Sequence, residues 1–281
     1  MSEMTDTICL AKGLEKSQSW ITAQALHGIS QFDQAMVDSY PDSQVSLQGA
    51  RQYLATIGDV CNYIAAVEKI DWARYFPRDA KVLDIGCGGG WLTAMLSRVD
   101  SVKVIYPLDS SKHFLNKLLP QVLELMQGCP EKVSVIEGLF EPLFFDDGAL
   151  DVVVASSALH HADNLESVLR EIRRSLKPGG LLFVLNETPW PGYRYLVSVC
   201  AAAVRIARDL LRERYQATSP SISSSGYLYD PKLGDRDYPL WYWHKALEMA
   251  GFSVETVVNT GLPTVKGSNG RSLSHFICRA V

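Results

Sequence analysis

The sequence has no dense run of lysine and arginine. Its 281 residues include 27 Lys and Arg against 31 Asp and Glu, which gives a formal net charge of -4. Proteins that bind nucleic acid usually carry a basic face, because neutralising phosphates supplies much of their affinity. The charge pattern therefore disfavours nucleic acid as a partner.

Paired cysteines are missing as well. The six cysteines are scattered singly and form no C-x-x-C pair, so neither a zinc site nor a thioredoxin-like motif is indicated. No cluster of carboxylates and histidines has the spacing of metal ligands, and we expect no metal. Dispersed cysteines in a chain of this size are typical of a reduced protein, which predicts a cytoplasmic location.

Signals for secretion and for membrane insertion are absent too. The first residues show no basic region followed by an apolar stretch. The longest mostly apolar stretch, 195–207, contains Arg205 and is too short to span a bilayer. We therefore expect no membrane span. Contact of this segment with a membrane surface or with a partner subunit, as in a homodimer, stays open.

From Lys81 onward, short apolar runs alternate with helical segments. Strands are expected at 81–85, 102–108, 132–137, 151–156 and 181–186, with two later strands at 254–258 and 273–279. Strands that are each followed by a helix form βαβ units, and right-handed crossovers then give a parallel sheet covered on both faces. The pattern predicts a doubly wound α/β domain over residues 79–281.

The flanking regions have a different texture. Residues 1–78 show no strand-like run and predict an N-terminal helical cap, with helices over 20–37 and 47–67. Residues 190–243 form an aromatic-rich insertion after the fifth strand. Its rings either line an acceptor pocket or pack a lid helix on the core. The loop at 219–226 has the composition of a hinge for such a lid.

The most informative segment is the strand and glycine-rich turn V-L-D-I-G-C-G-G-G-W at 82–91. A dinucleotide fingerprint, G-x-G-x-x-G, would require a third glycine where Trp91 stands. The segment instead resembles the first motif of the class I S-adenosylmethionine-dependent methyltransferases. That resemblance implies S-adenosylmethionine as cofactor, S-adenosylhomocysteine as product, and a mostly parallel seven-stranded sheet whose last strand is antiparallel.

The resemblance also implies which residues bind the cofactor. Asp84 would anchor the amino group, and Asp109, at the end of the second strand, would accept hydrogen bonds from the ribose hydroxyls. Asp109 also suits a helix N-cap, and both roles can coexist. The full set implied is Asp84, Gly86, Cys87, Gly88, Asp109, Ser110, Gly138, Leu139, Phe140 and Ser156.

One position departs from the family pattern. The turn after the third strand carries Leu139 where the family often has an acid for the adenine amino group. Adenine recognition would then fall to main-chain groups and to packing by Leu139 and Phe140. Further similarity at 143–153, 156–161 and 176–180 extends the resemblance over residues 80–187, whereas the first 78 residues hardly share it.

Candidates for a general base follow the fourth and fifth strands. His161 lies next to His160 after the fourth strand, and Glu187 ends the fifth. Ligands bind at this edge of open α/β sheets, and a base helps when the acceptor is a hydroxyl. Packing roles for both residues stay open. The Asn/Asp-Pro-Pro-Tyr signature of adenine and glutamine methyltransferases is absent.

Together these features predict methyl transfer from S-adenosylmethionine to an O, N or C atom of a small molecule, for example in natural-product or sugar biosynthesis. Two alternatives remain. One is a methyltransferase acting on protein or RNA, which a charged groove beside the pocket would favour. The other is a non-catalytic cofactor-binding partner.

Overall fold

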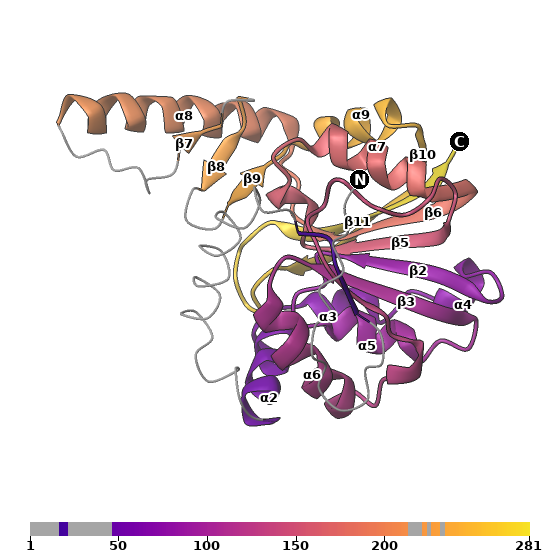
Figure 1. Ribbon diagram of the computed structural model, residues 1–281. Helices are drawn as coiled ribbons and strands as arrows, with labels where there is room; N and C mark the ends of the chain where they lie inside the picture. The colour runs from indigo at the N-terminus through magenta and orange to yellow at the C-terminus, as the bar shows by residue number, and fades with distance from the viewer. Residues whose placement is uncertain (1–16, 22–46, 213–220, 224–225, 231–233) are drawn as a thin grey trace.

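The computed structural model describes residues 17–21, 47–212, 221–223, 226–230 and 234–281. Figure 1 shows one sheet with helices on both faces and a long helix that extends away from it. The strands of the main sheet are β1 (Ser17–Ser19), β2 (Ala80–Ile85), β3 (Val102–Asp109), β4 (Val135–Glu137), β5 (Leu150–Ser156), β6 (Leu176–Glu187), β10 (Phe252–Pro263) and β11 (Ser272–Ala280).

The strand order is β1-β4-β3-β2-β5-β6-β11-β10. Strands β1 to β6 pair in parallel, whereas β11 runs antiparallel to both β6 and β10. Seven of these strands are the predicted ones, and the predicted doubly wound α/β fold is confirmed. Because β2 and β5 lie in the middle of the sheet, the switch in strand order places the carboxyl end of β2 at the centre of one edge.

The eighth strand, β1, corrects the expectation that residues 1–78 contain none. Ser17–Ser19 pairs in parallel with β4, and the Trp20 N–H donates to the Glu137 carbonyl at 2.7 Å. These three residues are polar and show no apolar alternation, so no sequence pattern predicts a strand here. Trp20 and Ile21 are not helical, and the rest of the helix predicted over 20–37 lies outside the described residues.

The helix predicted over 47–67 is divided. It consists of α2 (Leu47–Ala55), a π-helical turn (Thr56–Val60) and α3 (Tyr63–Val67). At the break the Asn62 side chain donates to the Pro263 carbonyl at 2.6 Å, which ties the segment to the end of β10. Val60, the last residue of the π-helical turn, is 52% exposed.

The helices α5 (Trp91–Ser97) and α6 (Leu119–Leu125) cover one face of the sheet with α2 and α3, while α7 (Leu165–Ser175) and α9 (Leu240–Met249) cover the other (Figure 1). Neighbouring residues of β2 therefore serve different cores: Val82 belongs to the first and Leu83 to the second. The remaining helical segments are α4 (Trp72–Tyr75), the short helices Phe114–Leu118, Pro130–Lys132 and Leu159–His161, and α8 (Gly192–Leu211).

The insertion after β6 consists of α8 and a small antiparallel sheet. Its strands are β7 (Ser221–Ile222), β8 (Leu228–Asp230) and β9 (Asp235–Asp237). The predicted hinge loop at 219–226 contains β7, and residues 219–220 and 224–225 lie outside the described part of the chain. Among the described helices, none combines the length and the apolar character needed to cross a membrane.

We expect Trp243→Ala to cost about 3–5 kcal/mol of unfolding free energy, the usual cost of emptying a large aromatic site in a core. Trp243 is 1% exposed and stacks on Phe276 with ring centroids 5.7 Å apart. Urea denaturation followed by circular dichroism measures the change. The control is Trp241→Ala, at a side chain that is 52% exposed, with a cost below about 1 kcal/mol. Equal costs would show that Trp243 is not a core residue.

Candidate active site

The glycine loop joins β2 to α5 and is attached to the neighbouring strand. The N–H groups of Gly86 and Cys87 both donate to the Leu108 carbonyl, at 2.8 and 3.1 Å. Gly86 and Gly88 have φ angles of 70° and 51°, in the left-handed region that favours glycine. The main chain therefore lies bare at the carboxyl end of β2, where a ligand can approach it closely.

Crowding at Gly86 brings two other predicted segments to this loop. A Cβ at Gly86 would lie 2.7 Å from the Ala158 Cβ and 3.1 Å from the Phe140 ring. Phe140 follows β4 and Ala158 follows β5, so the turns after both strands pack on the glycine loop. The sequence reasoning placed Phe140 beside the cofactor, and the structure puts its ring against Gly86.

The Asp109 carboxylate connects the loop to the end of β3. Its Oδ2 accepts from the Gly88 N–H and its Oδ1 from the Ser111 N–H, each at 2.9 Å. Asp109 thus closes a turn ahead of the next helix, whereas the side chain that caps the helix is Ser111, whose hydroxyl accepts from the Phe114 N–H at 3.2 Å. Each carboxylate oxygen has a second lone pair, so the ribose role remains a prediction. Ser110 is half-buried beside it.

Asp84 lies beneath the loop and is 1% exposed. Its Oδ2 accepts from the Thr93 hydroxyl at 2.6 Å. Burial raises the pKa of Asp84 to about 7, the Thr93 hydrogen bond opposes this rise, and the Asp109 carboxylate adds a smaller increase. A buried carboxyl that titrates near neutrality is one whose anionic form a ligand cation would stabilise.

At the end of β4, Glu137 is a candidate site residue that the sequence analysis did not select. Leu139 is 39% exposed, and the Gly138 N–H donates to the Asp109 carbonyl at 2.9 Å. Glu137 is 1% exposed, with Lys112 Nζ 3.4 Å from its Oε1, and its Oε2 is buried without a hydrogen-bond partner among the described residues. The available signal was a charged residue closing an otherwise apolar strand.

The N-terminal helices reach the same edge of the sheet. The Tyr53 hydroxyl of α2 accepts from the Gly89 N–H at 3.1 Å. Asn186, at φ 57°, donates through Nδ2 to the Ser156 hydroxyl at 2.9 Å and to the Tyr63 carbonyl at 3.3 Å. Ser156 is therefore held by a strained residue of the neighbouring strand, next to α3.

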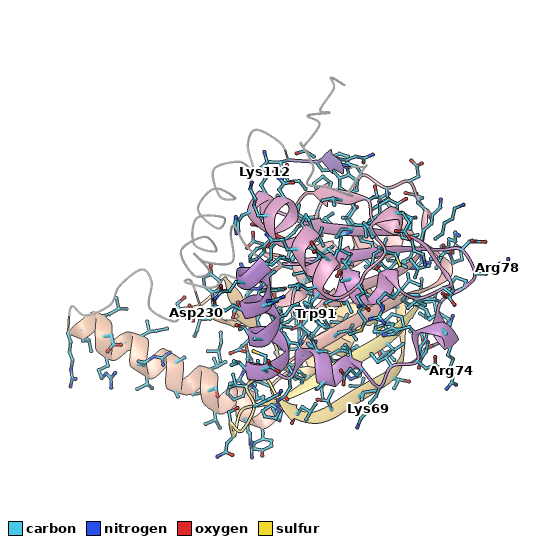
Figure 2. The ribbon with its side chains drawn as sticks, turned by 90° about the horizontal axis from the view of Figure 1, so that it is seen from below. Lys69, Arg74, Arg78, Trp91, Lys112 and Asp230 are labelled. Carbon is cyan, nitrogen blue, oxygen red and sulfur yellow. The ribbon has the colours of Figure 1, made fainter. Side chains whose placement is uncertain are left out.

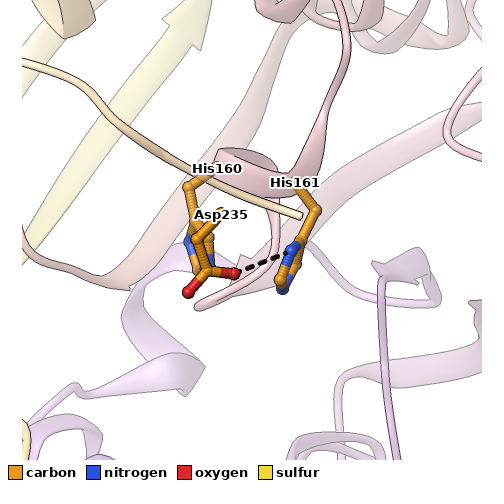
Figure 3. Close-up of side chains that lie close together, drawn as sticks. All are labelled: His160, His161 and Asp235. Carbon is orange, nitrogen blue, oxygen red and sulfur yellow. Dashed lines mark ion pairs between the residues drawn. The ribbon is translucent and has the colours of Figure 1, made fainter. Parts of the chain in front are cut away.

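His160, His161 and Asp235 lie close together beside the ends of β5 and β6 (Figure 3), and Glu187 contacts His160. His160 Nδ1 lies 2.8 Å from Glu187 Oε2, and His161 Nδ1 lies 3.1 Å from Asp235 Oδ1. Sequence reasoning selected His161 and Glu187 but missed Asp235, which β9 of the insertion brings in. We call His160, His161, Glu187 and Asp235 the histidine–carboxylate cluster.

The carboxylates and burial shift the pKa values of groups in this cluster. Burial opposes protonation of His160, but the hydrogen bond and charge of Glu187 together with the charges of Asp235 and Asp237 outweigh it and leave the pKa of His160 above its usual value. Burial raises the pKa of Asp235, against the lowering effect of His160. Glu187 Oε1 is buried without a partner among the described residues, so it can accept a hydrogen bond from a ligand.

The same cluster is the one set of described residues with metal-ligand geometry. Single ligand atoms of His160, His161 and Asp235 lie within 4.8 Å of one another. The expectation of no metal rested on sequence spacing, which could not bring Asp235 to the histidines. The contacts already present are a hydrogen bond between His160 and Glu187 and an ion pair between His161 and Asp235.

A small cavity opens onto the cluster. It has a volume of about 60 Å³ and is lined by His160, Glu187, Thr188, Asp235, Arg236, Asp237, Tyr238 and Trp243. Ligand pockets commonly measure ~300–1,000 Å³, so an acceptor larger than a few atoms requires movement of the insertion. A larger hollow of about 600 Å³ lies between α2, α3 and Lys266, and no predicted site residue lines it.

Comparison with known proteins matches the part of the chain that contains the glycine loop and strands β3 to β5. The sequence model of the methyltransferase domain family matches residues 83–184. A sterol 24-C-methyltransferase of Eremothecium gossypii is 29% identical over 182 residues, covering 62% of this chain and 40% of that protein. A ubiquinone biosynthesis O-methyltransferase of Xanthomonas axonopodis is 31% identical over 119 residues, covering 42% of this chain and 48% of that protein. The chain thus spans about half or less of these relatives.

Solved structures share the fold at low identity. A SAM-dependent methyltransferase from Aquifex aeolicus superposes with a TM-score of 0.52 at 16% identity, covering 84% of this chain and 99% of that one. The cyclase SpnF gives a TM-score of 0.53 at 17% identity, covering 74% of this chain and 78% of that one. At such identities the likeness establishes the fold, and one fold serves more than one chemistry.

The crowding at Gly86 can be tested with two glycines of positive φ. Gly86→Ala forces a Cβ to 2.7 Å from Ala158, whereas at Gly179 (φ 75°) nothing lies within 4 Å of the added atom. We expect Gly179→Ala to cost ~1 kcal/mol from backbone strain alone, and Gly86→Ala several-fold more. Thermal denaturation compares the two. Similar costs would mean that the loop has room to shift.

Proposed function

Because this chain belongs to the class I S-adenosylmethionine-dependent methyltransferase family, with S-adenosylmethionine as its cofactor, we propose that it methylates a hydroxyl oxygen of a small-molecule acceptor. The observation that carries the choice of a hydroxyl is the histidine–carboxylate cluster beside the ends of β5 and β6. A hydroxyl, unlike a neutral amine or a thiolate, benefits from a base at the moment of attack.

The residues at the centre of the sheet edge fit the cofactor. Bare main chain at Gly86 and Gly88 suits its methionyl part, and Asp84 suits its ammonium group, since pairing would offset the cost of burying a carboxylate. Asp109, at the end of β3, is the residue we assign to the ribose, and the unpartnered Oε2 of Glu137 can accept from a hydroxyl or amino group nearby. The bound cofactor supplies a methyl group already activated by the sulfonium.

On the acceptor side, we propose that His161 is the base. Asp235 Oδ1 lies 3.1 Å from His161 Nδ1, and a proton held on Nδ1 by this carboxylate would leave the lone pair on Nε2 to take the hydroxyl proton. The resulting imidazolium is stabilised by the Asp235 carboxylate. His160 is held by Glu187, and Glu187 Oε1 can orient a second hydroxyl of the acceptor. A polyhydroxylated molecule, such as a sugar or a phenolic natural product, matches these hydrogen-bonding groups.

Other acceptors and a non-catalytic role have weaker support. The names of the relatives include sterol, quinone and carbon acceptors, at 40% to 52% of their lengths. A protein or RNA acceptor would need a charged groove, whereas the cavity beside the cluster is small and lined by charges of both signs. The acid–base pairs of the histidine–carboxylate cluster favour a catalytic role over a non-catalytic one.

We expect cofactor affinity to fall as the pH falls through 7. Anionic Asp84 pairs with the ammonium group, and a pKa of about 7 means that protons compete for the carboxylate below that pH. Calorimetric titration should give a dissociation constant about eightfold higher at pH 6 than at pH 7.5. Asp84→Asn should bind weakly and without this dependence, while Asp100→Asn, on the surface, should behave as wild type. A flat profile for wild type would remove Asp84 from the cofactor site.

We expect His161→Gln to slow turnover about 100- to 10,000-fold while cofactor affinity stays within about twofold. Formation of S-adenosylhomocysteine from a panel of sugars, phenols, quinols and amines measures turnover, and His244→Gln is the matched control. Methylation of amines alone would contradict the hydroxyl acceptor. Loss of activity with a chelator, restored by a divalent cation, would assign the cluster to a metal instead of a base.

A further inference from the structure

The helix α8 has one face on the protein and a wide face in solvent. Of its 20 residues only Tyr195 and Ala202 are buried. The Tyr195 hydroxyl accepts from the Leu228 N–H at 3.2 Å, which fixes the helix to the small sheet of the insertion. In both Figure 1 and Figure 2 the helix extends well beyond the body of the domain.

The solvent face carries an apolar stripe. Tyr193, Leu196, Val197, Val204 and Leu211 recur at spacings of three, four and seven residues, and their exposed fractions lie between 66% and 87%. Such spacings align side chains along one face of a helix. Cys200, also exposed, lies in the same row. Exposed apolar side chains that form a continuous row indicate a surface that something covers.

Beside this stripe runs a row of arginines. Arg194, Arg205, Arg208 and Arg212 are all exposed, and they are separated by nearly whole numbers of helical turns. Asp209 is the only acid in the segment, so α8 is strongly basic in a chain whose formal net charge is -4. The row of positive charge and the apolar stripe lie next to each other along the whole helix.

A further exposed aromatic side chain lies near the N-terminal end of α8. Trp241 is 52% exposed, and its ring lies 3.7 Å from where a Cβ at Gly192 would be. Tyr193, the next residue after Gly192, is exposed as well. Amphipathic rings of this kind prefer the boundary between water and the headgroup region of a bilayer.

We propose that α8 docks on an anionic lipid surface, with its apolar stripe in the headgroup–acyl boundary and its arginines on the lipid phosphates. A basic amphipathic helix with an apolar face is the form that binds in the plane of a membrane interface. The positive charge of the arginines complements the negative charge of the lipid phosphates, and this favours a lipid surface as the occupant. The inference is independent of the proposed acceptor, because it concerns where the protein sits and not what it methylates.

A second copy of this chain fits the same face poorly. Two helices paired antiparallel through the stripe would bring Arg194 of one copy near Arg208 and Arg212 of the other. With Asp209 already 3.2 Å from Arg208 of its own chain, the helix has no other acid to offset that repulsion. Anionic phosphates supply the missing negative charge.

The test is co-sedimentation of the full chain with vesicles of phosphatidylcholine alone or with about 30% phosphatidylglycerol. We expect at least about tenfold stronger partitioning on the anionic vesicles. Arg205→Gln with Arg212→Gln should reduce it about 25-fold, since each arginine near an anionic surface is worth roughly a factor of five. The exposed Arg78→Gln serves as the matched control and should change it less than twofold.

The apolar stripe needs its own variant. Leu196→Ser with Val204→Ser should weaken binding about a hundredfold or more, because two aliphatic side chains no longer leave water. Met249→Ser with Val281→Ser, two exposed apolar positions elsewhere, should leave binding unchanged. Anionic vesicles should also slow alkylation of Cys200 by a maleimide. Circular dichroism and cofactor titration establish that each variant is folded.

Three results would overturn the proposal. Equal binding to neutral and anionic vesicles would remove the role of the arginines. Absence of vesicle binding, with a dimer in sedimentation velocity that the Leu196→Ser, Val204→Ser variant dissociates, would make a second copy the occupant. Absence of vesicle binding by a monomer would leave the stripe without a lipid partner.

Discussion

The two hydrogen bonds accepted by the Asp109 carboxylate determine where the rest of the site lies. One oxygen holds Gly88 of the glycine loop and the other holds Ser111 at the start of the next helix. The Asp109 carbonyl in turn accepts from Gly138, so the turns after β2, β3 and β4 share one residue. Because each turn is short, this fixes the positions of Asp84 below and Phe140 beside the loop. A cofactor meets an edge that is already organised.

The central sheet could be predicted because its signals are local. Parallel strands buried on both faces appear as continuous apolar runs, and the glycine-rich turn after β2 separates that strand from a helix. Ser17–Ser19 has no such signal, since its position depends on the free edge of β4. The break at Cys61–Asn62 was also invisible in the sequence, because it is made by hydrogen bonds to residues about two hundred positions away.

The candidate site divides in the same way. Asp84, Asp109, His161 and Glu187 each follow a strand end, where the chain pattern alone places functional groups in an α/β sheet. Asp235 and Tyr53 enter from an insertion and from the N-terminal region, so their arrival depends on how those segments pack. The result matters chemically. His160 pairs with Glu187, and Asp235 lies 3.1 Å from His161 Nδ1 and 3.6 Å from His160 Nε2, so that it links the two histidines.

The contacts of α2 and α3 affect how the chain can be recombined. Tyr53 touches the glycine loop, and Tyr63 touches Ser157 and Asn186, so the N-terminal region contributes to both the cofactor side and the acceptor side. A chimera that exchanged residues 1–78 for those of a relative would therefore remove the contact of Tyr53 with the glycine loop and the contacts of Tyr63 with Ser157 and Asn186. Such an exchange would need a matching change in the central sheet edge, because both tyrosines travel with the N-terminal segment.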